Sequence, residues 1–229
     1  MKNGICQKIE NSYIAIYKLT SKINKIHILC RRENEIQISD IEMYVNGTKV
    51  TPYYLTERWW RNKEDYDYIA YDYPSSGEYE VKIIFKKTLI DMQYLFHTID
   101  YMINITFNET FDTSHVLNMK SLFSNCNNLQ YINVSSFNTT LVGDFYATFH
   151  DCKELTSLDL SSFDIRNYAI GTIITNNINL KYIDISSFDL SVYSDVIFFR
   201  NISENAEIVI DKKYSAFTSK IGYKIVFKE

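Results

Sequence analysis

Three consecutive residues near the middle of the chain, His150, Asp151 and Cys152, have side chains that could do chemistry. A thiol beside an imidazole and a carboxylate can serve as a nucleophile, and the same side chains bind transition metals. The remaining histidines are scattered, at His27, His97 and His115. There is no G-x-S-x-G, Walker or H-E-x-x-H motif, and six glycines are too few and too dispersed for a phosphate loop. We therefore expect no catalytic residue, no metal site and no cofactor, and predict that the protein is not an enzyme.

Two aspartates form a second candidate site, because Asp159 and Asp184 follow Asn133 at intervals of 26 and 25 residues. If they stack on neighbouring strands about 5 Å apart, their carboxylates repel and attract a cation or a basic partner. The alternative is that they belong to a repeat pattern and are solvated or hydrogen-bonded, since one column offers few ligands for a metal. Asp159 and Asp184 stay candidate binding residues.

The stretch "YYLTERWWRNKEDYDYIAYDY" is the densest group of aromatic residues. Tyr and Trp side chains bring a large contact area at low entropy cost, so they often form binding hot spots. Aromatic residues are also common in strands, and half of these could face a core instead. The candidate binding residues in this stretch are Trp59, Trp60, Tyr66, Tyr68 and Tyr71.

The composition narrows the classes of partner. Lys plus Arg is 24 and Asp plus Glu is 28, a net charge of −4, which offers no basic surface for nucleic acid. No apolar run is long enough to span a membrane, and the first residues do not resemble a signal peptide. We expect an intracellular protein unless a leader has been removed, with the cell surface as the alternative. The four cysteines are too sparse for a disulfide framework.

The elements that must position these residues are repeats. A phenylalanine recurs at intervals of 26, 26 and 25 residues, and other columns keep the same period. The columns are Phe111, Phe137, Phe163 and Phe188; Leu129, Leu155 and Leu180; Ile132, Leu158 and Ile183; Val134, Leu160 and Ile185; and, upstream, Phe96, Phe123, Phe149, Ile174 and Phe199. Each unit reads L-x-x-[IL]-x-[VLI]-S-S-F-[DN]. Because one such coil cannot bury its own apolar face, the units must stack, and the pattern predicts a solenoid.

Within each unit the alternating apolar residues predict a short strand, and successive strands should stack in parallel. The Asp or Asn after each phenylalanine should close an Asx-turn with the backbone two residues on. The segment "VGDFYATFHDCKEL" has apolar residues at roughly helical spacing, so we expect a helix on the convex side. Cys126 and Cys152, at the same position of adjacent coils, suit a disulfide or, more commonly, buried thiols.

The stretch "FDTSHVLNMKSLFSNCNNLQYINVSSFNTT" resembles the BspA-like leucine-rich-repeat proteins, whose repeats run F-D-T-S-x-V-x-N-M-x-x-M-F-x-x-C-x-x-L-x-x-L-D-L-S-x-F. The resemblance covers about residues 81–210. The third coil departs from it, with Asn177 in place of the cysteine and Ile174 in place of the phenylalanine. This family includes many cell-surface and adhesion-type proteins, so the resemblance implies binding to proteins or host surfaces rather than catalysis.

Residues 1–78 show no repeat but contain strand-like runs, and Asn46-Gly47 is a hairpin signal. We predict a small all-β, sandwich-like module over 1–78 and a leucine-rich-repeat solenoid over 79–229, in which the module and the C-terminal tail cover the two ends. The fold class expected is α+β. The function expected is a non-enzymatic protein-binding module of the recognition or adhesion type. The alternative is a structural subunit of a larger complex, such as a capsid, filament or cilium.

Overall fold

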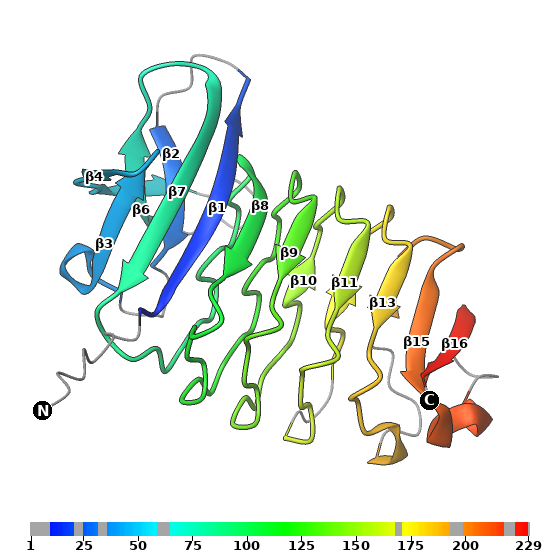
Figure 1. Ribbon diagram of the computed structural model, residues 1–229. Helices are drawn as coiled ribbons and strands as arrows, with labels where there is room; N and C mark the ends of the chain where they lie inside the picture. The colour runs from blue at the N-terminus through cyan, green and yellow to red at the C-terminus, as the bar shows by residue number, and fades with distance from the viewer. Residues whose placement is uncertain are drawn as a thin grey trace, which may run out of the picture.

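The computed structural model joins a β-sandwich module to a β-solenoid, and the two stand side by side in Figure 1. It describes residues 10–20, 25–31, 36–58, 65–167, 171–192, 199–217 and 223–228. Strands make up 42% of the structure and helical turns 5%. The described helical turns are three short 3-10 segments, η1 (Ile38–Asp40), η2 (Leu190–Val192) and η3 (Lys212–Phe217).

The predicted all-β module has two sheets, which share one apolar core. The first runs in the order β4 (Thr48–Val50), β3 (Ile41–Val45), β7 (Gly77–Phe85), β1 (Ser12–Leu19), β8 (Met102–Phe107) and β9 (Tyr131–Asn133). The second runs in the order β2 (Lys25–Cys30), β6 (Asp65–Asp72) and β5 (Tyr53–Arg58). Asn46 and Gly47 link β3 to β4 with φ of 48° and 76°, which confirms the hairpin turn.

The module and the solenoid share a strand. β8 pairs antiparallel with β1 on one edge and parallel with β9 on the other, so the first sheet continues into the first solenoid coils. β7 pairs with β1 and β3, and the boundary expected at residue 78/79 falls inside this strand. The change from antiparallel to parallel pairing therefore occurs at β8.

The solenoid consists of about four turns, and its strands are parallel as the repeat predicts. One ladder contains β11 (Ser157–Asp159), β13 (Tyr182–Asp184), β15 (Glu207–Asp211) and β16 (Lys224–Lys228), which follow β9 along the axis in Figure 1. A second ladder contains β10 (Phe149–His150), β12 (Ile174–Thr175) and β14 (Phe199–Arg200). The tail strands β15 and β16 extend the first ladder, with Ile208 opposite Ile183 and Ile225 opposite Ile208.

Two columns of phenylalanine rings form stacks through the solenoid core. In the first, the Phe111 and Phe137 ring centres lie 5.7 Å apart, and Phe137 and Phe163 lie 6.1 Å apart. In the second, Phe123 stacks on the ring one coil earlier at 5.1 Å and on Phe149 at 5.5 Å. Because each ring packs against the equivalent ring of an adjacent coil, its full burial, worth roughly 1.5–3 kcal/mol, requires that coil to be in place.

The corners of each coil are closed by Asn and Asp side chains. The residue after each repeat phenylalanine accepts a hydrogen bond from the backbone N–H two positions on, at 2.9–3.1 Å, which confirms the predicted Asx-turns. These residues are Asp112, Asn138, Asp164 and Asp189. Thr139 joins two such corners, because its hydroxyl donates to the Asp164 carbonyl at 3.0 Å and accepts from the Asp164 N–H at 2.7 Å.

The predicted α+β class is wrong, since the structure is nearly all β and the expected convex helix is absent from the described residues. In that segment Phe149 N–H bonds to Ile173 O at 3.0 Å and Asp151 N–H to Thr175 O at 2.9 Å, both in the next coil. Ala147 and Asp151 have φ of 56° and 57°, which no right-handed helix contains. Hydrogen bonds between coils thus replace the bonds within a helical turn.

Candidate binding surfaces

The first parallel ladder carries the predicted aspartates. Each strand buries its central residue, such as Leu158 or Ile183. In β11 the residues on both sides of it are exposed, whereas in β13 only the residue before it is. Tyr131 and Tyr182 occupy one outward column and are 54% and 37% exposed, with Ser157 at the same position of the intervening coil. The face therefore displays two aromatic side chains on a fixed backbone.

The structure brings Asp159 and Asp184 together as directly paired residues of β11 and β13. Each carboxylate accepts the backbone N–H two residues on, at 2.9 and 2.8 Å. Asp159 is exposed, whereas Asp184 is 3% exposed and lies 3.0 Å from the Lys228 ammonium. Burial raises the pKa of Asp184, but hydrogen bonds from Ser186 and Lys228 outweigh it and hold the pKa below the ordinary value. Turn closure and an ion pair account for these two carboxylates.

The aromatic stretch does not form one exposed surface within the described residues. Trp59 and Trp60 lie outside the described residues, and Tyr71 is half-buried, edge-on to Tyr73 at 5.1 Å. Tyr66 and Tyr68 are 5% and 2% exposed, because β6 packs against the first coil of the solenoid. These two tyrosines are consequently in an intramolecular contact and are not available to a partner.

The residues around Cys152 do not converge into a catalytic group. The Cys152 thiol is fully buried and donates to Phe123 O at 3.1 Å, and burial raises its pKa to about 12. His150 lies on the surface, with its Nε2 atom 3.1 Å from an Asp151 carboxylate oxygen. Cys126 and Cys152 are free thiols, so the disulfide alternative is not realised. Within the described ranges no three His, Cys, Asp or Glu side chains cluster as metal ligands.

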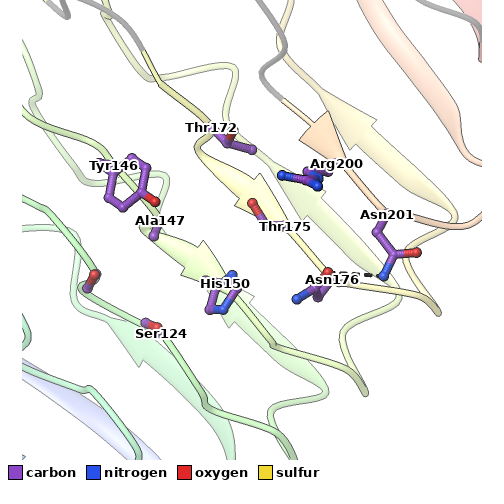
Figure 2. A pocket seen from close by; sticks show the side chains of 10 residues that line it. Ser124, Tyr146, Ala147, His150, Thr172, Thr175, Asn176, Arg200 and Asn201 are labelled. Atoms are coloured by element: carbon purple, nitrogen blue, oxygen red, sulfur yellow. Dashed lines mark hydrogen bonds between the residues drawn. The ribbon is translucent and has the colours of Figure 1, made fainter. Parts of the chain in front are cut away.

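A polar groove lies across the second ladder of the solenoid and was not predicted from the sequence. Its volume is about 610 Å³. Figure 2 shows His150, Thr175 and Arg200 reaching it from successive strands, and Tyr146 stands at one side. The lining residues are Ser121, Ser124, Tyr146, Ala147, His150, Thr172, Thr175, Asn176, Arg200 and Asn201. Nine of these ten are polar, so the groove suits a ligand rich in hydrogen-bonding groups.

Residues with positive φ recur at one position of every coil, and two of them, Asn176 and Asn201, line the groove. These residues are Thr98, Asn125, Asp151, Asn176 and Asn201, with φ between 54° and 61°. Asn and Asp adopt this left-handed conformation more readily than other side chains. A column of Asn and Asp at intervals of 25 and 26 residues was the signal in the sequence that marks this face.

The fold and its surfaces define a class: a β-solenoid repeat protein with a β-sandwich at one end and polar and aromatic side chains displayed along its coils. The chain belongs to the family described as Mycoplasma protein of unknown function, DUF285, whose model matches residues 90–209, more than half of the 229 residues. The match begins where the first coil begins and ends within β15. No curated protein and no solved structure matches the chain. Among the described residues, no helix has the length and apolar character needed to cross a bilayer.

Proposed function

We propose that this protein is a non-enzymatic recognition module that binds another protein on the outer face of the first parallel ladder. The observation that carries the proposal is the pair Tyr131 and Tyr182, exposed on rigid strands and separated by the small side chain of Ser157. Tyrosines held by strands lose little entropy on binding, and the gap between them can receive an apolar side chain.

The repeat architecture is compatible with this proposal, because solenoids present long surfaces built from equivalent positions. The resemblance of the coils to BspA-like leucine-rich repeats also supports it, as that resemblance implies surface recognition. The buried thiols and the turn-closing aspartates have structural roles, which supports a role in binding over one in catalysis.

The test is capture of proteins from an extract of the source cells on three immobilised chains. These are the wild type, a variant with Tyr131→Ser and Tyr182→Ser, and a control with Leu141→Ser, which removes a side chain that is 52% exposed elsewhere. We expect one protein to be retained by the wild type and the control but lost from the double variant. Retention of the same proteins by all three chains, or of none, contradicts the proposal.

A structural subunit is a second candidate, favoured by the end of the first ladder. Among the described strands β16 is the last of its sheet, and its Phe227 is 39% exposed. An edge strand can pair with a further strand. Light scattering of the purified chain separates the two functions, since an assembly subunit should exceed the mass of one chain at micromolar concentration.

A further inference from the structure

The second sheet of the β-module docks on one face of the first solenoid coil. Cys30 N–H bonds to Leu95 O at 2.9 Å, which ties β2 to this coil. The Tyr66 ring stacks on the His97 imidazole with centres 5.5 Å apart, and the Tyr68 hydroxyl lies 2.7 Å from the Thr98 hydroxyl. Two tyrosines spaced two residues apart on β6 thus make side-chain contacts across this interface.

The same positions recur in the later coils, and the backbone hydrogen bonds establish their equivalence. Thr98 N–H bonds to Ser124 O at 2.9 Å, and the same bond repeats from Asn125 to His150 at 2.7 Å. It recurs twice more, from Asp151 to Thr175 and from Asn176 to Arg200, both at 2.9 Å. His150 is therefore the counterpart of His97 two coils later, and Asn176 is a counterpart of Thr98.

Beyond the first coil this face is open and becomes the groove of Figure 2. Where the first coil has Tyr94 and His97, the second coil has Ser121 and Ser124, and these smaller side chains leave space. The groove is thus continuous with an interface that the protein already makes with its own strand β6. The contacts at that interface indicate what the groove is shaped to receive.

We propose that the groove binds an extended segment of a partner polypeptide that carries tyrosines two residues apart, in the manner of β6 on the first coil. One tyrosine ring stacks on His150. The hydroxyl of the second accepts a hydrogen bond from Asn176 Nδ2 in the following coil, whereas β6 contacts adjacent residues of one coil. The Asn176 Oδ1 atom is already engaged, because it accepts from Asn201 Nδ2 at 3.0 Å.

This inference deepens the proposed function, since it rests on the chain being a protein-binding module, but it concerns a different face. Its failure is therefore separable from failure of the function. Loss of groove binding leaves the capture by Tyr131 and Tyr182 unchanged, and loss of that capture leaves groove binding unchanged.

The test uses a fluorescent peptide with the β6 sequence, Asp-Tyr-Asp-Tyr-Ile-Ala-Tyr-Asp, titrated with the full chain and followed by anisotropy. We expect saturable binding, and at least tenfold weaker binding of a peptide whose first two tyrosines are serines. The protein variants are His150→Ala and Asn176→Gly, the glycine being chosen because φ is 61° at position 176. Each should weaken binding about tenfold, whereas Leu117→Ser, an exposed position outside the groove, should not.

Three outcomes overturn the proposal. The first is no binding at millimolar peptide. The second is equal affinity of the wild type and the His150→Ala variant, which would place the peptide on the first coil after displacement of the chain's own β6. The third is binding of a neutral oligosaccharide such as chitotetraose, lost in the His150→Ala variant, with no binding of the peptide.

Discussion

Asn177 lies one coil beyond Cys152, at the same position, and makes the hydrogen bond that the thiol makes. Cys126 and Cys152 donate their thiols to the carbonyls of Phe96 and Phe123 at 3.0 and 3.1 Å. Asn177 donates its amide to Phe149 O at 3.0 Å and also accepts from Cys152 N–H at 2.8 Å. The departure from the repeat pattern therefore preserves the interaction and adds a second one.

Replacing Asn177 should separate these two hydrogen bonds. Asn177→Ala leaves the buried N–H of Cys152 without its partner and removes the side-chain bond to the Phe149 carbonyl, so we expect the free energy of unfolding to fall by about 1–3 kcal/mol. Asn177→Cys restores the donor but not the acceptor and should lose less. Urea denaturation followed by circular dichroism measures both. Equal losses in the two variants, or a loss below about 0.5 kcal/mol for alanine, would contradict this account.

The Thr139 hydroxyl joins two coils, and its removal should be costly although the volume is kept. Thr139→Val leaves the N–H and the carbonyl of Asp164 unpaired, so we expect a loss of about 1–3 kcal/mol in the free energy of unfolding. Thr139→Ser keeps the hydroxyl and is the matched control, with a smaller loss from the missing methyl group. A valine variant as stable as the serine variant would show that the hydroxyl contributes little.

Acid should weaken the corner at Asp189. Hydrogen bonds from the Ser191 hydroxyl and backbone and from the Tyr214 hydroxyl lower the pKa of Asp189 to about 2. Because the folded pKa lies below the unfolded value of about 3.9, the stabilisation is present above pH 4 and is lost as the pH falls toward 2. The stability difference between the wild type and Asp189→Asn should shrink over this range. Urea denaturation at pH 5, 4, 3 and 2.5 checks this, and a constant difference argues against it.

Alkali should destabilise the core of the β-module. Burial raises the pKa values of Tyr13 and Tyr17 well above 10, and neither hydroxyl has a hydrogen-bond partner in the described part of the chain. The folded state holds these protons more tightly than the unfolded state, so stability is full below pH 10 and falls above it. The slope is about 1.4 kcal/mol per pH unit for each group. Buried thiols, whose pKa values are also raised, begin this decline nearer pH 9.

Tyr13→Phe should reduce the slope above pH 10. At pH 7 it should be neutral or stabilising, because an unpaired hydroxyl is removed from the core. Denaturant unfolding at pH 7, 9, 10 and 11 provides the comparison, with Tyr131→Phe as the exposed control. A slope unchanged by the buried substitution would show that another group governs alkaline unfolding.

The sequence predicts those features of the fold that depend on one residue type per coil. The Phe137 column stacks and the Asp164 corner closes as expected, since phenylalanine recurs in the first column and only Asp or Asn occurs in the second. The helix was predicted in error. The spacing of apolar residues around Phe149 suits a helix, but it suits equally well a short strand flanked by residues with left-handed backbone conformation. Only the column that includes Asp151 and Asn176 distinguishes the two.

The surfaces were harder to predict because they depend on which coil of the solenoid contacts the β-module. Nothing local in "DYDYIAYD" indicates that Tyr66 and Tyr68 face the first coil, since the contact joins residues about 30 positions apart. The groove likewise arises from the absence of bulk at Ser121 and Ala147, and small residues give no signal on their own.

Strand β8 is hydrogen-bonded along both edges, and this pairing has a mechanical consequence for a protein that binds a partner. A pull along the solenoid axis reaches the sandwich through the parallel bonds to β9 and the antiparallel bonds to β1, and it acts along these bonds. Load spreads over many bonds at once. The two parts should resist tension as one body and rupture in a single event.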